Sequence, residues 1–456
     1  MKYHIQTFGC QMNVYDTKSM MGLLNGAGHE FTENLEEAEM ILLNTCSIRE
    51  GAEQRVRGRI GQLKRYKDQG RLRFLGVCGC MGQKEGSLLT DAVPYLDLVM
   101  GPGAIGSITR LVDELERGHR PLVDINGIED EYDQPFPAAE EAVAYPRFVS
   151  VMKGCNKKCA FCVVPSTRGP ERSRDPRIIL QEVETLACKG YREITLIGQT
   201  INSYRFAGIR FPQLLAMVNQ VPGLDRLRFT TSYPSTSIRG LFEAMASLDK
   251  VCEQLHLPVQ SGSNRILKAM RRTYTREEYL SQVRYFRSLY QGRALQPGIT
   301  TDIIVGFPGE TEDDFQQTLD LVREARFDAA FMFKYSPRPG TAAAVMENPV
   351  DDYIKARRLD TLLRLQHDIA REQNQNLVGS TVEVMIEQSA PSSIGKMEYE
   401  GRMRTGRIVK LSGPSGAYQP GDLVGVTLTG CTSYTLFGQP VLSAEFRQGG
   451  WKSHVA

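Results

Sequence analysis

The chain has 456 residues, 41% of them hydrophobic and 24% charged, which is ordinary for a globular protein and enough for several domains. A net charge of +2 excludes attraction of nucleic acid through the overall field, so such a partner would need local basic patches. The sequence shows no apolar signal segment and no membrane-length run, and we expect a soluble, cytoplasmic protein. Ten unevenly placed cysteines favour metal or redox chemistry over a disulfide framework.

Residues 1–117 predict an α/β domain with a parallel sheet. Short apolar runs alternate there with helix-like segments, and the runs read "YHIQTF", "MILLNT", "RFLGV" and "LDLVMG". Residues 118–146 break this pattern with Pro, Gly and six acidic residues between Glu129 and Glu141. They predict a linker.

Residues 147–376 predict a partial TIM-like (β/α) barrel, because candidate strands alternate with helical patterns. The expected strands are Phe148–Met152, Glu193–Ile197, Arg226–Thr231, Gln254–Val259, Ile299–Val305 and Ala329–Tyr335. Active-site loops of such barrels follow the carboxyl ends of the strands. Between the last two strands, Thr311 and Asp314 have the spacing of a capping box that opens a helix.

Residues 377–445 predict a small antiparallel β-barrel. The sequence changes here to short runs in which apolar and polar residues alternate, such as "STVEVMIEQ", "GRIVKLSG" and "DLVGVTLTG". Gly and Pro separate these runs.

Three cysteines follow the first barrel strand within one loop: Cys155, Cys159 and Cys162. Eight Lys and Arg against two acidic residues lie between Arg147 and Arg177, so thiols there should ionise readily. Three close thiolates without a fourth ligand suit a 4Fe-4S cluster that leaves one iron open. The alternatives are a structural zinc site or unrelated core thiols, which the short spacing at a strand end disfavours.

Three further cysteines each follow a predicted strand of the first domain: Cys10, Cys46 and Cys80. The ends of parallel strands share one edge, so these thiols can meet there, although chance placement of core thiols is the alternative. Cys78 would face the same way as Cys80, and we prefer Cys80 because it lies in the loop. The remaining thiols are expected to be buried and inert: Cys188, Cys252 and Cys431.

The C-x3-C-x2-C loop with Phe161 before its last cysteine resembles the radical S-adenosylmethionine (radical SAM) superfamily. Together with "TFGCQMN", "NTCSIRE", "GCMGQ", "HLPVQSGSN", "VGFPGET" and "YSPRPGT", it resembles the methylthiotransferase family over essentially the whole chain. The resemblance implies an N-terminal domain with a second three-cysteine 4Fe-4S cluster, a radical SAM barrel and a C-terminal TRAM domain that binds RNA.

The reaction implied by the resemblance uses two molecules of S-adenosylmethionine. One methylates sulfur on the N-terminal cluster, and the other yields the radical that removes hydrogen from carbon 2 of an adenine, where the methylthio group is installed. By position within matching motifs, the cofactor-binding residues are expected to be Phe161, Gln199, Gln260, Ser261 and Gly306.

The stretches "CVVPSTRG" and "GRMRTGRIV" resemble the branch of the family that modifies isopentenylated adenosine beside the tRNA anticodon. The chain departs from that branch at Tyr233 in "TSYP", where the family pattern has His, and in "GQTINSY", which changes a pocket edge. The alternatives are a methylthiotransferase for threonylcarbamoyladenosine in tRNA or for a ribosomal-protein aspartate. A non-enzymatic iron–sulfur protein that binds RNA or carries electrons is the rival of another class.

Four basic residues within an acid-free stretch of the expected TRAM domain are predicted to contact tRNA phosphates: Arg402, Arg404, Arg407 and Lys410. A solvated basic turn is the alternative. By family analogy we also expect an external electron donor, flavodoxin or ferredoxin. Nothing in the sequence suggests an obligate interface, so a monomer is expected.

Overall fold

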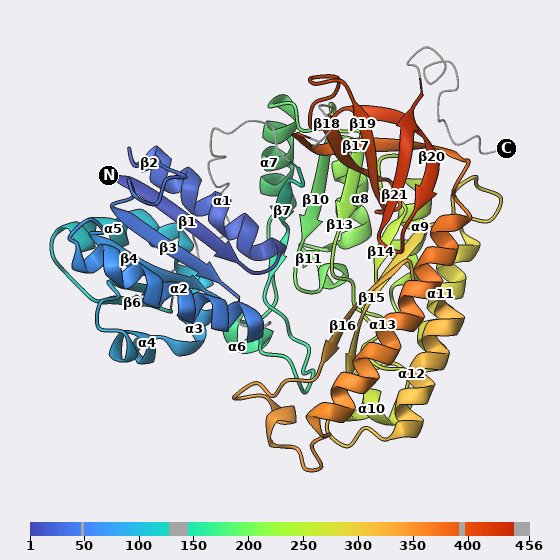
Figure 1. Ribbon diagram of the computed structural model, residues 1–456, viewed down its shortest axis with the longest axis horizontal. Coiled ribbons are helices and arrows are strands. Elements are labelled where there is room, and N and C mark those ends of the chain that lie inside the picture. The colour runs from blue at the N-terminus through green and yellow to red at the C-terminus, as the bar shows by residue number, and fades with distance from the viewer. Residues whose placement is uncertain (47–49, 127–144, 392–396, 442–456) are drawn as a thin grey trace.

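The computed structural model describes residues 1–46, 50–126, 145–391 and 397–441, and the chain forms three domains in sequence order (Figure 1). This order of α/β domain, partial barrel and small β-barrel confirms the predicted fold class.

The N-terminal domain is a six-stranded sheet in the order β2-β1-β3-β4-β5-β6, with every described pair parallel. All residues of β3 and β4 are buried, which explains why their sequences are continuous apolar runs. The strands are β1 (Lys2–Phe8), β2 (Glu30–Phe31), β3 (Met40–Thr45), β4 (Phe74–Gly79), β5 (Leu98–Met100) and β6 (Leu122–Asp124). The helices are α1 (Gln11–Gly26), α2 (Glu50–Asp68), α3 (Cys80–Glu85), α4 (Ser87–Ala92) and α5 (Ile108–Glu116).

The sheet extends further along the chain than the sequence predicted. Strand β6 lies inside the linker expected over 118–146, yet it pairs with β5 in parallel and completes the sheet. Its three residues are too short for a periodicity signal, so only the pairing reveals them. Most of the expected linker, 127–144, lies outside the described residues.

The central domain is a partial barrel made of two three-stranded parallel sheets, β13-β10-β7 and β14-β15-β16. An isolated parallel bridge pairs Leu227 of β13 with Val251, three residues before β14 begins. The strands are β7 (Phe148–Ser150), β10 (Glu193–Ile197), β13 (Arg226–Phe229), β14 (Gln254–His256), β15 (Gly298–Val305) and β16 (Ala329–Lys334). The helices between and after them include α7 (Pro176–Cys188), α8 (Phe211–Asn219), α9 (Arg239–Ser247), α11 (Arg276–Ser288), α12 (Glu312–Ala325) and α13 (Asp352–Gln375).

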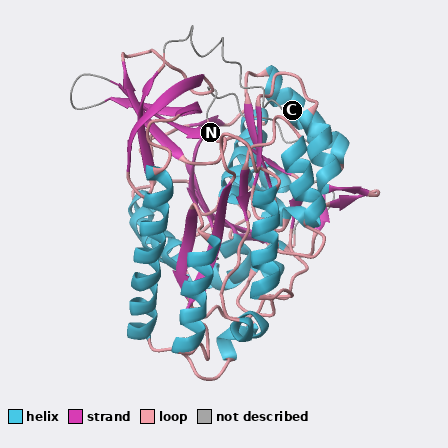
Figure 2. Cartoon of the chain, turned by 90° about the vertical axis from the view of Figure 1, so that its right-hand side faces the viewer, coloured by secondary structure: helices cyan, strands magenta, loops and turns pink. Residues whose placement is uncertain are grey.

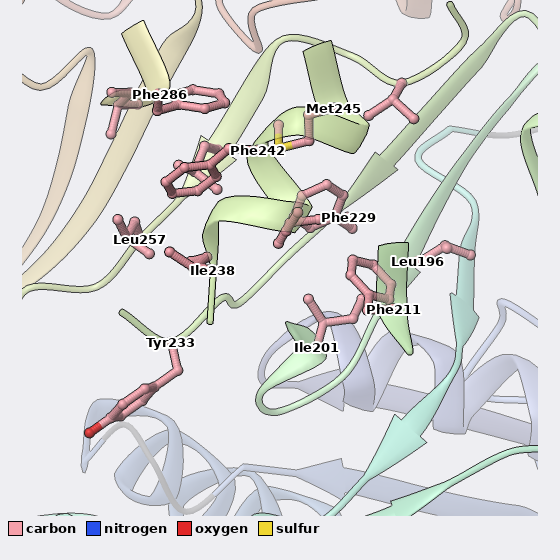
Figure 3. Close-up of a cluster of buried hydrophobic side chains, with 14 of the residues drawn as sticks. Leu196, Ile201, Phe211, Phe229, Tyr233, Ile238, Phe242, Met245, Leu257 and Phe286 are labelled. Atoms are coloured by element: carbon pink, nitrogen blue, oxygen red, sulfur yellow. The ribbon is translucent and has the colours of Figure 1, made fainter. Parts of the chain in front are cut away.

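One continuous apolar core fills the space between these strands and their helices. Figure 3 shows part of it, where Phe211 from α8 meets Phe229 from β13 edge to face with ring centroids 5.2 Å apart. Helix α12 begins at the predicted capping box, since the Thr311 hydroxyl accepts from the Asp314 amide and the Asp314 carboxylate accepts from the Thr311 amide. That expectation is confirmed.

The C-terminal domain is a closed barrel in the order β17-β18-β19-β21-β20. Four of its strand pairs are antiparallel, as predicted for a small antiparallel β-barrel, whereas β19 and β21 pair in parallel. The reason is that β20 lies between them in sequence, and two reversals of the chain return β21 to the direction of β19. The strands are β17 (Thr381–Pro391), β18 (Met397–Met403), β19 (Ile408–Gly413), β20 (Leu423–Cys431) and β21 (Thr435–Pro440).

Two buried arginines fix this small barrel onto the central domain. Arg226 Nη1 donates to the Arg402 carbonyl at 2.8 Å, and Arg228 Nη2 donates to the Met403 carbonyl at 2.8 Å. Arg226 is the first residue of β13, so the contact lies at the amino ends of the central strands. Figures 1 and 2 show the small barrel at that end of the molecule.

The N-terminal domain packs beside the open edge of the central barrel. Met12 and Tyr15 of α1 form an apolar cluster with Ile197 of β10, and Cys10 and Phe148 pack against it. No described helix is long and apolar enough to cross a membrane.

Candidate metal centres

The loop that carries Cys155, Cys159 and Cys162 follows β8 (Met152–Lys153), the short extension of β7. Gly154 starts the loop with φ +75°, and a Cβ there would lie 1.9 Å from the Pro170 carbonyl oxygen, so only glycine fits. The Cys155 amide donates to the Gly169 carbonyl at 3.1 Å, which closes the base of the loop. The three thiols therefore lie at the carboxyl end of the first barrel strand.

Each of the three sulfurs lies within hydrogen-bond distance of a donor. The Lys157 amide donates to Cys155 Sγ at 3.4 Å, and the Thr200 hydroxyl lies 3.4 Å from the same sulfur. The Val164 amide donates to Cys162 Sγ at 3.5 Å, and the Arg272 guanidinium donates to Cys159 Sγ at 3.2 Å. Donors aimed at sulfur are what ligating thiolates require.

The donor set, three thiols within one loop, fits a 4Fe-4S cluster with one iron left open, because each thiol can bind a different iron. All ten cysteines lie in the described residues, and none of them forms a disulfide. Burial raises the pKa of Cys162 to about 12, contrary to the expectation from the basic sequence that thiols in this loop ionise readily.

The second set of cysteines lies at the carboxyl edge of the N-terminal sheet. Cys10 caps α1, Cys46 follows β3, and Cys80 opens α3 directly after β4. A Cβ at Gly9 would lie 2.9 Å from Cys46 Cβ, which shows how closely the first two loops approach. A hydrogen bond with Cys46 lowers the pKa of Cys10 to about 6 although burial opposes it, and the charge of Arg168 also lowers it.

Cys78 lies in a different environment from Cys80. It is 1% exposed in the apolar core between β3 and β5, and burial raises its pKa to about 12. This placement keeps Cys78 as a core thiol and leaves Cys80 at the sheet edge. Of the thiols expected to be buried, Cys252 is buried and Cys431 partly so, but Cys188 is exposed because it ends α7 on the solvent side.

A single arginine connects the two sets of cysteines. Helix α6 (Val164–Arg168) begins two residues after Cys162 and ends at Arg168, whose Nη2 donates to Asp16 Oδ2 of α1 at 2.8 Å. Although burial lowers it, the charges of Asp16, Cys80 and Cys10 raise the pKa of Arg168. Arg168 therefore lies close to Cys10 and Cys80, and it is joined through the short helix α6 to the loop that carries Cys162.

The five residues expected to bind the cofactor have different environments. Phe161 is partly buried against the apolar cluster that includes Ala160. Gln199 follows β10, and its Oε1 atom is buried without a hydrogen-bond partner among the described residues. Gln260 is 7% exposed with φ +72°. An orphaned buried acceptor such as Gln199 Oε1 fits a ligand that donates to it.

Two of the expected cofactor residues already have partners within the chain. The Ser261 hydroxyl accepts from the Ser263 amide at 3.2 Å and lies 3.4 Å from the Thr318 hydroxyl. The Gly306 amide donates to Glu310 Oε2 at 2.7 Å. These two residues therefore already take part in internal hydrogen bonds, whereas Gln199 keeps a buried acceptor without a partner among the described residues.

The basic residues expected to contact RNA have carboxylate partners. Arg404 pairs with Glu253 at 2.9 Å and Arg407 with Asp328, and both acids belong to the central domain. Arg402 pairs with Glu387 at 3.0 Å, and Lys410 lies 3.5 Å from Glu400 within the small barrel. Arg404 and Arg407 therefore hold the two domains together, a role that the sequence did not indicate because their partners are distant in sequence.

Sequence reasoning missed an aromatic face inside the central barrel. Phe331 and Phe333 on β16 are 51% and 39% exposed, because Ala330 and Met332 between them face the core on the α13 side. On the same face, Phe333 pairs in register with Ile304, which packs with Ala160 of the cysteine loop. The apolar–polar alternation of β16 is absent from the sequence, so no pattern marked this face.

A histidine and an aspartate complete this face. His256 of β14 meets Phe331 edge to face at 5.9 Å, and its Nε2 atom lies 3.5 Å from Asp302 Oδ2 of β15. The interior of the partial barrel therefore offers exposed rings beside a polar pair, and it leads to the cysteine loop.

A partial (β/α) barrel with three cysteines in the loop after its first strand is the architecture of a radical SAM protein, and the family model for the radical SAM superfamily matches residues 149–322. A second model, described as "Uncharacterized protein family UPF0004", matches residues 2–101. The solved structure of the radical SAM methyltransferase TsrM from Kitasatospora setae is similar in fold, with a TM-score of 0.57 and 12% identity over 86% of this chain and 81% of that one.

Two curated relatives match nearly the whole chain, and both are named tRNA-2-methylthio-N(6)-dimethylallyladenosine synthase. One, from a Thermoanaerobacter species, is 44% identical over 96% of this chain and 92% of its own length. The other, from Corynebacterium urealyticum, is 40% identical over 98% of this chain and 84% of its own length. The chain belongs to the tRNA-2-methylthio-N(6)-dimethylallyladenosine synthase family, which confirms the resemblance found in the sequence.

Proposed function

We propose that the protein is a radical SAM transferase that installs a methylthio group at carbon 2 of isopentenylated adenosine beside the anticodon of tRNA. Cys155, Cys159 and Cys162 would hold one 4Fe-4S cluster, and Cys10, Cys46 and Cys80 a second. With S-adenosylmethionine bound, the first cluster would supply the radical chemistry that breaks the carbon–hydrogen bond of the purine, and the second would supply the sulfur.

The observation that carries this proposal is the link between the two sets of cysteines through Arg168. A sulfur transfer needs the radical site and the sulfur donor at one substrate, and α6 spans from Cys162 to the ion pair with Asp16 beside Cys10. An electron carrier or an RNA-binding scaffold needs no such coupling of two cysteine sites across a domain boundary. The proximity therefore favours the enzyme over the non-enzymatic alternative.

The side chains on the interior face of the barrel favour isopentenylated adenosine as the substrate. Exposed rings of Phe331 and Phe333 can stack on a purine and pack against a five-carbon apolar substituent. Asp302, beside His256 on this face, would repel the carboxylate of a threonylcarbamoyl group or an aspartate. This feature favours isopentenyladenosine over the two other methylthiotransferase substrates.

The remaining expectations belong to the same proposal. The protein would act on tRNA in the cytoplasm as a monomer and take its electrons from flavodoxin or ferredoxin. The small barrel is the expected TRAM domain. Because Arg404 and Arg407 have partners in the central domain, contact with phosphates would come from other exposed residues of that barrel, with Lys410 as the remaining candidate of the predicted four.

Anaerobic reconstitution tests the proposal. The full chain is loaded with iron and sulfide and given reductant, S-adenosylmethionine and tRNA that carries isopentenyladenosine, and its nucleosides are analysed by mass spectrometry. We expect a mass gain that matches one methylthio group, lost when any one of Cys155, Cys159 and Cys162 becomes Ala. Matched tRNA with threonylcarbamoyladenosine should remain unmodified.

The other outcomes decide between the alternatives. Production of 5′-deoxyadenosine without a modified nucleoside would keep the enzyme class and reject the substrate. Two intact clusters with neither product would favour the non-enzymatic reading.

A further inference from the structure

Each of the three guanidinium nitrogen atoms of Arg272 donates a hydrogen bond to a partner at or near the cysteine loop. Its Nη1 atom donates to Cys159 Sγ at 3.2 Å, its Nη2 atom to the Pro258 carbonyl at 3.0 Å, and its Nε atom to the Tyr274 hydroxyl at 2.8 Å. A planar fork held at three points cannot rotate away from the sulfur.

Two aromatic rings hold the same charge in place. The Arg272 Cζ atom lies 4.4 Å from the centroid of the Tyr233 ring and 5.2 Å from that of Tyr274, and the two rings meet edge to face at 5.8 Å. Figure 3 shows Tyr233 at the margin of the apolar core with its hydroxyl turned away from Ile238. The hydrogen bonds of Arg272 go to a sulfur, a carbonyl and a hydroxyl, and the two aromatic faces stabilise its charge.

The backbone of this segment is also bonded to the cysteine loop. The Ala160 amide, between Cys159 and Phe161, donates to the Met270 carbonyl at 3.0 Å, and the Ala160 carbonyl accepts from the Ala343 amide at 2.8 Å. Met270 lies two residues before Arg272, after α10 (Asn264–Ala269). The distance from the guanidinium to Cys159 is therefore set by backbone as well as by side-chain bonds.

We propose that Arg272 is a positioning residue that raises the reduction potential of the cluster held by Cys155, Cys159 and Cys162, with Tyr233 and Tyr274 fixing its guanidinium. Addition of one electron from the external donor makes the cluster more negative, and a cation bonded to a ligating sulfur stabilises that reduced form. The inference rests on the proposed function, because it requires the cluster. It also gives Tyr233, the departure from the family pattern, a definite role.

The test is the midpoint potential of the cluster, measured by electron paramagnetic resonance at a series of solution potentials. The full chain is used with Cys10, Cys46 and Cys80 replaced by Ala, so that the signal comes from one cluster. We compare the parent with Arg272→Gln, which keeps the size and removes the charge, and with Arg272→Lys, which keeps the charge and removes the fork. Arg271→Gln is the matched control, since the neighbouring Arg271 is exposed.

Arg272→Gln should make reduction of the cluster at least tenfold less favourable. Its midpoint potential should therefore be lower by at least about 59 mV, the value for a tenfold change in a one-electron couple. The midpoint potential of Arg272→Lys should lie between those of Arg272→Gln and the parent, and the midpoint potential of Arg271→Gln should equal that of the parent. Tyr233→Leu, which removes one ring wall and leaves the charge, should shift the potential in the same direction by less.

Equal potentials in the parent, Arg272→Gln and Arg272→Lys, at equal iron content, would overturn the inference. A folded Arg272→Gln chain that holds no cluster would also overturn it, because Arg272 would then serve assembly; if that chain does not fold, Arg272→Lys decides by the same criteria. A parent chain that takes up no cluster would instead reject the proposed function.

Discussion

Arg168 and Asp16 form an ion pair that is almost closed to solvent, with side chains 5% and 8% exposed, across the boundary between the central and N-terminal domains. It fixes α6 against α1 and so fixes one cysteine set relative to the other. Because both partners are buried, the pair matters most when one of them is removed.

Asp16→Ala leaves the Arg168 charge buried without its partner, and we expect the chain to lose about 3–5 kcal/mol of unfolding free energy. Denaturant unfolding measures this. Asp68→Ala is the control, because its pair with Lys64 is half exposed and should contribute below about 1 kcal/mol. Equal losses in the two variants would contradict a special role for the buried pair.

Substitutions in the two sets of cysteines should have different effects on the reaction. Cys159→Ala should abolish formation of 5′-deoxyadenosine from S-adenosylmethionine and halve the bound iron. Cys80→Ala should also halve the iron, but it should keep 5′-deoxyadenosine formation and lose the methylthio product. Cys78→Ala should retain both activities, since Cys78 packs in the core. Product analysis with iron determination distinguishes these patterns, and an inactive Cys78→Ala chain of normal stability would reassign the second set.

Phe331→Ala should weaken use of the isopentenylated tRNA. Loss of a stacked ring removes about 1–3 kcal/mol, or roughly 5- to 150-fold in kcat/KM. Tyr353→Ala is the control, since Tyr353 is 76% exposed at the start of α13 and outside the barrel interior. Steady-state kinetics with intact tRNA measures the effect. Similar kcat/KM values for the two variants would show that the substrate does not use the aromatic face.

Asp314 should make the protein sensitive to acid. Burial raises its pKa, but hydrogen bonds from Arg265, Ser263 and Thr311 outweigh this and hold the pKa of Asp314 well below its usual range. A carboxyl with a depressed folded pKa stabilises the protein above its unfolded pKa of about 3.9, and that contribution is lost as pH falls toward the folded pKa. The free energy of unfolding of Asp314→Asn, measured against pH, should fall less steeply below about pH 4 than that of the parent.

Arg404→Ala should loosen the attachment of the small barrel without changing the number of phosphate contacts. The slope of log Kd for tRNA against log salt should stay the same, whereas removal of a phosphate contact lowers its magnitude by about 1. Limited proteolysis should cut between the domains faster, because the bonds of Arg404 to Glu253 and to the Val251 carbonyl are lost. A reduced salt slope would restore Arg404 as an RNA contact.

Local patterns predicted the elements well where one face or both faces of an element are apolar. The strands Met40–Thr45 and Glu193–Ile197 have the predicted bounds, and the helix cap at Thr311 and Asp314 is where its spacing indicated. These features depend on neighbouring residues alone. Partners distant in sequence could not be predicted, because a basic run such as that around Arg404 reads the same whether it faces RNA or an acid of another domain.

The same limit explains what was missed at the candidate site. The C-x3-C-x2-C spacing and the strand ends marked all six proposed ligands in the sequence. Arg272 lies more than a hundred residues after Cys159, and nothing local indicates that it bonds to that sulfur. The contact exists only because the fold returns the segment after α10 to the cysteine loop.

The docking of the small barrel through Arg226 and Arg228 has a consequence for the length of RNA that the protein can recognise. The cysteine loop lies at the carboxyl ends of the central strands and the small barrel at their amino ends, and the eight residues of β15 span about 25 Å. Because Arg226 and Arg228 hold this separation, an RNA that contacted both the cysteine loop and the small barrel, as the proposed function expects, would have to reach about 25 Å, which a free nucleoside cannot do.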